Sequence, residues 1–146
     1  MPAPPARPAP ALLIDTNVIL DVILARDPWA SDAVRTLDAV SRKRARGFVS
    51  AHAVTTLYYL VEKVRDRMTA NTAVADVLQL LEVVPLDSSD FQRAVALNLP
   101  DFDDAVQVAA HLRAGADFLI TRNAKHFTNA PVTVMSPGEI LAILAE

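Results

Sequence analysis

Short apolar runs alternate with helix-like patterns along most of the chain. At 30–40, 54–61 and 74–81, apolar residues recur at the three- and four-residue spacing of amphipathic helices. Strands that alternate with helices form a parallel sheet covered on both faces, so the pattern predicts a three-layer α/β/α fold. The apolar runs that predict its strands are Ala11–Ile14, Gly47–Ser50, Val83–Leu86, Phe118–Thr121 and Val132–Met135.

Local signals mark two helix ends and one segment without periodic structure. Gly115 predicts a helix stop, and Ser136–Glu139 combines a capping box with proline at the first helical position. Residues 1–10 contain five prolines and no apolar periodicity, which predicts a disordered arm before a single domain at 11–146. The arm lacks the apolar centre of a signal peptide.

Composition narrows the class of protein and the chemistry open to it. The 146 residues are 52% hydrophobic and 21% charged, as in one globular domain. The longest apolar stretch, Val18–Ala25, is interrupted by Asp21 and is shorter than the ~18 residues of a membrane span. Cysteine is absent, so a metal ion must be held by oxygen or imidazole. We expect a soluble, cytoplasmic protein without a membrane partner.

Aspartates lie at the end of one predicted strand and at the start of one predicted helix. Asp15 directly follows the first predicted strand, and carboxyl ends of strands are where ligands collect in α/β sheets. Asp101 and Asp104 extend the apolar stripe of a later helix, whereas Asp103 falls with Gln107 on the wetter side. Each acid could instead cap its helix or favour the positive end of the helix dipole. If the fold brings them together, their oxygens form a hard-cation site.

Two further segments carry positively charged side chains. In the turn after the fourth predicted strand, Thr121 and Asn123 could hydrogen-bond water on a metal, and Arg122 or Lys125 could meet phosphate oxygens. An ordinary polar turn is the alternative. The net charge of −3 argues against binding of nucleic acid through the overall charge of the protein, but a local basic patch can still bind it. The candidate patch is the run 41–46, including Arg42, Lys43 and Arg44, which could equally be a solvated helix end.

The chain resembles PIN-domain proteins, including the VapC-like toxins of bacterial toxin–antitoxin pairs. The resemblance spans residues 12–141 and rests on the order and spacing of four blocks rather than on any one of them. These blocks are Leu13–Asp21, Phe48–Ser50 with Val54–Tyr59, Asp101–Ala105, and Ala114–Asp117 with Ile120–Asn123.

The resemblance implies a Rossmann-like fold and a ribonuclease centre in which acids bind Mg²⁺ or Mn²⁺. By position it implies Asp15 and Asp104 as metal ligands, with Asp101 as a neighbouring ligand and Asn123 in support. Asn17, Thr121 and Thr56 would complete the surroundings of the site, as the predicted supporting residues. It also implies an RNA substrate, a small antitoxin partner and a homodimer.

This sequence departs from the family pattern at two acids. Many relatives carry an acid where this chain has Thr56 and another where it has Asn123, and Glu62 lies too far along its helix to substitute. Mg²⁺ can be held by one or two carboxylates when phosphate and water complete its shell. We therefore expect weak or selective nuclease activity.

Histidine and aromatic residues give no clear site in the sequence. His52, His111 and His126 are far apart and fit no zinc spacing. His52, near the tip of the second predicted strand, could reach the cleft, and a polar surface or helix-start position is the alternative. The aromatic residues Trp29, Tyr58 and Tyr59 are expected to pack, although one could stack on a base.

Three classes of function remain open from the sequence. The leading hypothesis is a metal-dependent endoribonuclease in which a metal-activated water cleaves RNA over the strand tips. The second is a PIN-like module that binds RNA or protein without catalysis. The third is a signalling receiver domain with Asp87 as phosphoacceptor. Against this class, the sequence lacks the paired acids that a receiver domain carries after its first strand.

Overall fold

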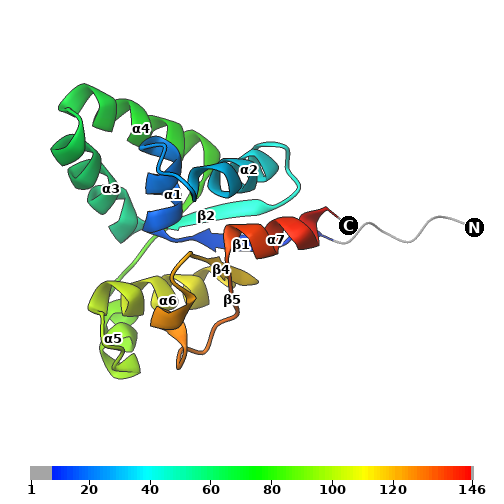
Figure 1. The fold of residues 1–146 in the computed structure, drawn as a ribbon. Helices are drawn as coiled ribbons and strands as arrows, with labels where there is room; N and C mark the ends of the chain where they lie inside the picture. The colour runs from blue at the N-terminus through cyan, green and yellow to red at the C-terminus, as the bar shows by residue number, and fades with distance from the viewer. Residues whose placement is uncertain (1–7, 146) are drawn as a thin grey trace, which may run out of the picture.

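A five-stranded parallel sheet forms the centre of the molecule, which is a computed structural model that describes residues 8–145 (Figure 1). The strand order is β3-β2-β1-β4-β5, so the chain runs outward from the central strand in one direction and then returns to build the other half. The strands are β1 (Ala11–Ile14), β2 (Arg46–Ser50), β3 (Glu82–Val84), β4 (Phe118–Ile120) and β5 (Val134–Met135).

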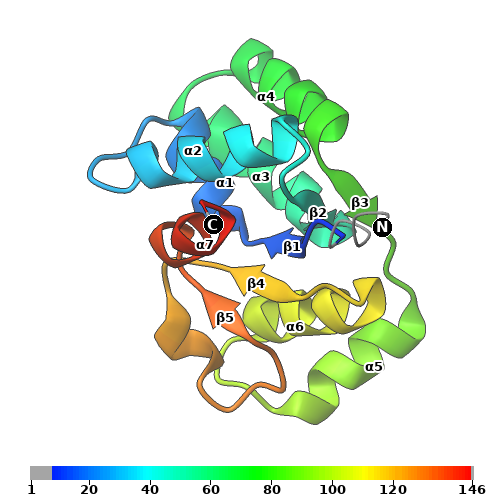
Figure 2. The same cartoon turned by 90° about the vertical axis from the view of Figure 1, so that its right-hand side faces the viewer.

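Helices cover both faces of this sheet. The helices α1, α2, α3, α4 and α7 lie over one face, and α5 and α6 lie over the other (Figures 1 and 2). The arrangement confirms the predicted three-layer α/β/α fold. The bounds are α1 (Thr16–Ile23), α2 (Ala30–Ser41), α3 (Ala51–Val64), α4 (Arg67–Leu80), α5 (Ser88–Leu97), α6 (Phe102–Ala114) and α7 (Pro137–Leu144), with a 3₁₀ helix η1 (Ala124–Phe127).

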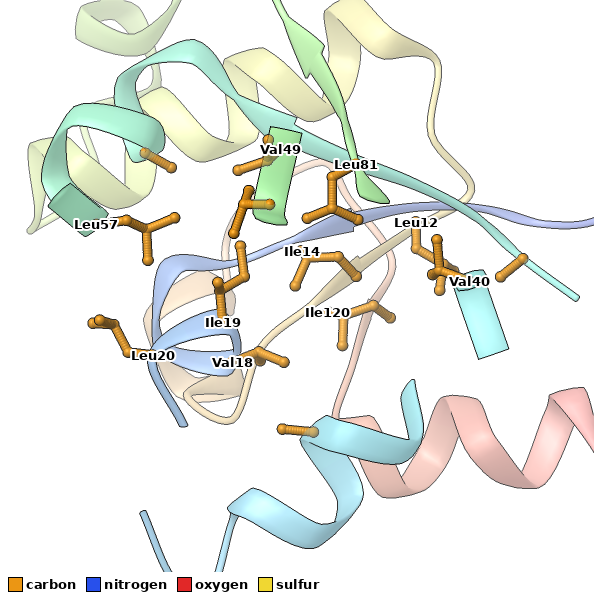
Figure 3. Packing of buried hydrophobic residues seen from close by; sticks show 14 of the residues in the cluster. Leu12, Ile14, Val18, Ile19, Leu20, Val40, Val49, Leu57, Leu81 and Ile120 are labelled. Atoms are coloured by element: carbon orange, nitrogen blue, oxygen red, sulfur yellow. The ribbon is translucent and has the colours of Figure 1, made fainter. Parts of the chain in front are cut away.

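The central strand is buried because its side chains alternate between two apolar layers. Leu12 and Ile14 pack with Val18 and Ile19 on the face covered by α1 (Figure 3), whereas Leu13 packs on the opposite face under α6. All of these side chains are fully buried. This packing fixes the register of β1, and therefore the direction in which the residue after Ile14 points.

The sequence located the elements well and their ends less well. Each predicted strand exists, with ends shifted by up to two residues, and Gly115 adopts the left-handed conformation (φ +63°) that stops α6. The capping box at Ser136 and Glu139 is present. Helix α5 was not predicted because only Asp90 and Ala94 along it are buried.

The structure describes only part of the predicted N-terminal arm, and it also bears on the prediction that the chain does not span a membrane. Residues 1–7 of the predicted disordered arm lie outside the described residues, while the Ala9 and Pro10 carbonyls accept hydrogen bonds from Arg46. Within residues 8–145, none of the helices is both long and apolar enough to cross a membrane.

Candidate functional site

The candidate site is a cavity of about 320 Å³ at the carboxyl edge of the sheet. Strands β1, β2 and β4 end there side by side, and α1 and α3 begin there with Asp15 and Ser50 as their N-caps. Helix α6 also directs its N-terminus, capped by Asp101, at this cavity. The lining residues are Asp15, Thr16, Asn17, Leu20, Arg26, His52, Thr56, Asp101, Asp103, Asp104, Gln107, Arg122, Asn123 and His126.

Asp15 is the most buried acid in the cavity, with 7% of its surface exposed. Its Oδ1 accepts hydrogen bonds from the Thr16 backbone N–H (2.8 Å) and from Gln107 Nε2 (2.9 Å), and its Oδ2 accepts one from Thr121 Oγ1 (2.8 Å). Burial raises the pKa of Asp15, and these three donors oppose that shift only in part. Asp15 therefore forms a fixed carboxylate stabilised by neutral donors.

Asp104 faces Asp15 from the first turn of α6. Burial, together with the negative charges of Asp101 and Asp15, raises the pKa of Asp104 to about 6. The Asp104 Oδ2 lies 3.2 Å from His126 Nδ1 of η1, and Asp101 accepts a hydrogen bond from the Asp104 backbone N–H (3.1 Å) as the helix cap. The fold thus brings carboxylates 89 residues apart into mutual repulsion across one cavity.

A divalent cation fits the chemistry of this donor set. The carboxylates of Asp15, Asp104 and Asp101 offer only hard oxygen ligands, and a cation between them would relieve the repulsion that raises the pKa of Asp104. Among residues 8–145, no three side chains of ligand type are already gathered around one point. Water and phosphate oxygens would therefore have to complete the coordination, as they commonly do for Mg²⁺.

Two of the predicted supporting residues, Asn17 and Thr121, form a hydrogen-bonded chain with Asn123 behind Asp15. Thr121 Oγ1 accepts hydrogen bonds from Asn17 Nδ2 (3.2 Å) and from the Asn123 backbone N–H (3.1 Å) while donating to Asp15. Thr56 lines the cavity but directs its hydroxyl to the carbonyl of His52 (3.3 Å). The first three residues position Asp15, whereas Thr56 adds neither charge nor a contact to it.

Arg122 has a different partner from the phosphate predicted for it. Its Nε donates to Asp21 Oδ2 (2.8 Å), and its guanidinium lies 4.0 Å from the centroid of the Trp29 ring. Arg26 Nε also donates to Asp21 (2.8 Å), whose carboxylate is only 1% exposed. Both arginines line the cavity, but a buried acid holds their charges in place.

The basic run at 42–46, a predicted phosphate-binding patch, does not line the cavity. The run leads into the amino end of β2, at the sheet edge opposite the one where Asp15 lies. Arg42 pairs with Asp38 (2.9 Å), Arg44 donates to the Leu144 carbonyl, and Lys43 turns the chain with φ +62°. The run therefore forms the end of α2, and its binding of phosphate stays a prediction.

Two histidines and a glutamine line the cavity; the sequence allowed His52 to reach it but gave no signal for His126 or Gln107. His52, the second residue of α3, lies 2.8 Å from Asp103 Oδ1, and His126 contacts Asp104. Gln107 was predicted on the wetter side of α6, yet it is 3% exposed and donates to Asp15. The prediction failed because α6 is buried on all sides from Ala105 to His111, between the sheet and α5.

The remaining candidates lie elsewhere. His111 is buried away from the cavity, and its burial lowers its pKa. Tyr58 packs against the core, whereas Tyr59 is 59% exposed. Asp87 caps α5, and hydrogen bonds from Ser89 and Arg113 hold its pKa well below the usual range. A capping residue beyond an edge strand does not form the acid cluster of a receiver domain.

Comparison with known proteins places this architecture in a family. Residues 11–125 match the family model described as "PIN domain". Ribonuclease VapC1 of Aquifex aeolicus (strain VF5) is 25% identical over 133 residues, which cover 88% of this chain and 91% of that protein.

Solved structures share the fold at lower identity. VapBC2 from Rickettsia felis, bound to a DNA fragment from its promoter, has a TM-score of 0.70 at 16% identity, covering 86% of this chain and 98% of that one. A toxin–antitoxin complex from Klebsiella pneumoniae has a TM-score of 0.66 at 23% identity, covering 86% and 97%. Because the family model covers most of the described residues and the fold agrees, the chain belongs to the PIN domain family.

Proposed function

We propose that this protein is a metal-dependent endoribonuclease and the toxin of a toxin–antitoxin pair. The observation that carries the proposal is the convergence of Asp15 and Asp104 on one cavity, where repulsion between carboxylates raises the pKa of Asp104. The similarity to a protein named Ribonuclease VapC1 supports RNA as the substrate. Mg²⁺ or Mn²⁺ is the cation that the oxygen donors favour.

The side chains of the cavity divide into those that bind and those that position. Asp15 and Asp104 would hold the cation with Asp101 beside them, while Thr121, Asn17 and Asn123 orient Asp15. A bound divalent cation lowers the pKa of water and offsets negative charge on the phosphoryl group during hydrolysis.

The N-termini of α1, α3 and α6 are the protein's own contribution to phosphate binding. All three helices begin at the cavity, where the positive ends of their dipoles favour an anion, and the side chains of Asp15, Ser50 and Asp101 each accept from one N–H group of the first turn. With the arginines held by Asp21, these helix ends and Lys125 are the groups available to a phosphate.

A small antitoxin is the proposed protein partner, and a homodimer in the cytoplasm is the proposed state of the free toxin. Structural neighbours were solved as toxin–antitoxin complexes, which supports the partner. The structure also carries an apolar cavity of about 790 Å³ between α1, α2 and α4, away from the acids, and the Met68 side chain at its edge is 79% exposed.

The direct test is RNA cleavage by the purified protein in Mg²⁺ or Mn²⁺, compared with an Asp15→Ala variant and with a chelator. We expect cleavage that requires the cation and is lost in the variant. A protein that binds neither cation, and whose RNA cleavage is unchanged by Asp15→Ala, would contradict the proposal.

A catalytically silent RNA- or protein-binding module is the second candidate. It is favoured by the neutral side chains of Thr56 and Asn123 in the cavity and by the absence, within residues 8–145, of a gathered set of three ligands. Thr56→Asp combined with Asn123→Asp discriminates between the candidates. A large gain in cleavage from almost none identifies a decayed enzyme, whereas substantial wild-type activity excludes the silent module.

A further inference from the structure

A second cavity adjoins the acid cavity, and the function proposed so far uses only its Lys125 and the acids that the two cavities share. It has a volume of about 350 Å³ and shares Asp101, Asp104 and His126 with the acid cavity. From there it extends between the segment before α6 and the end of η1. An RNA strand that lies over the acids would therefore extend directly into this second cavity.

Lys125 gives the second cavity a free positive charge. Of the lysine and arginine side chains that line either cavity, Arg26 and Arg122 are paired with Asp21, whereas Lys125 has no carboxylate partner among the described residues. Lys125 is exposed on η1, next to the His126 that contacts Asp104. It is thus the cation best placed to bind a phosphate beside the acids.

The rest of the lining suits a nucleobase. Leu99 and Pro100 offer an apolar surface, while Thr128 and Asn129 offer hydroxyl and amide groups. The Asn129 side chain is exposed and can both donate and accept, as base edges require. The volume lies at the lower end of ligand pockets, roughly 300–1,000 Å³, which is suited to one nucleotide rather than to a folded segment.

We propose that this second cavity binds the nucleotide next to the cleaved bond, with Lys125 on its phosphate and Asn129 on the edge of its base. The cavity then sets a base preference at that position. This inference rests on the proposed ribonuclease function and adds to it a source of sequence selectivity. A peptide as occupant is the competing outcome.

The test uses the full chain and two sets of four short RNAs that differ only in the base on the 5′ or the 3′ side of the cleaved bond. Lys125→Ala and Asn129→Ala are compared with Lys63→Ala at the far end of α3 and Asn71→Ala on α4, matched changes at exposed sites that line neither cavity. Cleavage gives kcat/KM for each RNA. Fluorescence anisotropy with Asp15→Asn protein gives the affinity without cleavage.

The two variants are expected to differ in kind. Asn129→Ala should change the ratio between the best and worst base by about fivefold or more. Lys125→Ala should weaken binding to every RNA alike and make the dependence of log affinity on log salt shallower by about 0.7. The control variants should match the wild type, and thermal unfolding confirms that all variants fold.

The outcomes separate the two proposals. Wild-type cleavage with a base ratio that Asn129→Ala leaves unchanged overturns the second cavity as a nucleotide site and leaves the ribonuclease intact. Absence of wild-type cleavage in Mg²⁺ and Mn²⁺ overturns the ribonuclease, and the anisotropy series then decides the nucleotide site alone. Variants that bind every RNA as the wild type does exclude RNA from this cavity and favour the peptide.

Discussion

Two buried aspartates six residues apart have opposite surroundings. Asp21, on α1, is 1% exposed and receives charged hydrogen bonds from Arg26 and Arg122. Asp15, before α1, is 7% exposed and receives only neutral ones, from a threonine hydroxyl, a glutamine amide and a backbone N–H. Similar burial thus comes with a compensated charge in one case and an uncompensated charge in the other.

The difference separates a structural acid, Asp21, from Asp15, the acid that we propose binds the cation. A buried carboxylate is costly unless it is paired, and Asp21 is paired within the chain. Asp15 forms no ion pair among the described residues, and its charge, together with that of Asp101, raises the pKa of Asp104. A chain that carries such an arrangement has a site that a cation from outside would stabilise.

The largest expected effect is on catalysis, in Asp15→Asn. We expect RNA cleavage to fall about a hundredfold or more, because the variant loses the charge that the cation needs. The free energy of unfolding should change by no more than about 1 kcal/mol, since the amide keeps most hydrogen bonds. Cleavage assays and urea unfolding check both parts, and a strongly unfolded variant with normal activity per folded molecule would reverse the assignment.

Asp21→Asn should instead affect folding. Removing the charge that pairs with both arginines is expected to lower the free energy of unfolding by about 3 kcal/mol. Asp38→Asn, which breaks the exposed pair with Arg42, is the matched control and should cost at most about 0.5 kcal/mol. Equal losses in the two variants, measured by urea unfolding, would show that the Asp21 network is no stronger than a surface pair.

Acidity should stabilise the metal-free protein through Asp104. Its pKa of about 6 exceeds the value of 3.8 for a free side chain, so between these values the folded state binds more protons than the unfolded state. This group's contribution to stability is present at low pH and is lost as the pH rises through 6. We expect the unfolding temperature of wild type relative to Asp104→Asn to rise as the pH falls from 7 to 5.

The cation should show the reverse dependence. Protons compete with it for the same carboxylates, so Mn²⁺ affinity measured by calorimetry should fall over the same interval in which metal-free stability rises. Identical pH profiles for the wild type and Asp104→Asn would mean that the acids do not repel one another.

The smallest effect is expected from the basic run. Arg42→Ala combined with Arg44→Ala removes charges at the opposite sheet edge from Asp15, so kcat/KM for RNA should change less than about twofold at physiological salt, beyond one Debye length of about 8 Å. Steady-state cleavage kinetics check this. A loss of kcat/KM as large as that in Lys125→Ala would show that bound RNA also contacts the basic run at the opposite edge of the sheet.

Local patterns predicted the parts of the site that depend on neighbouring residues. Asp15 follows a fully buried run and Asp101 caps a helix, and both features are set by residues next to them in the chain. Alternating elements then place these ends on one edge of the sheet, as general rules for parallel sheets require.

Side-chain contacts between residues that are distant along the chain could not be predicted from the sequence. Asp21 read as an interruption in an apolar stretch, and its two arginines lie 5 and 101 residues away. His52 and His126 come from different elements on either side of α6, so their spacing carries no signal. Gln107 was assigned to the wet side because helical periodicity cannot reveal that a helix is covered on both sides.

The position of β1 in the middle of the sheet has a mechanical consequence. One wall of the acid cavity comes from the half built by residues 16–64 and the other from the half built by residues 98–127. Strand β1 lies between the two halves, and the contacts of His52 with Asp103 and of Arg122 with Asp21 join them across the cavity. The width of the cleft therefore depends on the twist between β2 and β4 as well as on these contacts. Substitutions under the sheet, far from any acid, can widen or narrow the opening and so tune which substrates enter.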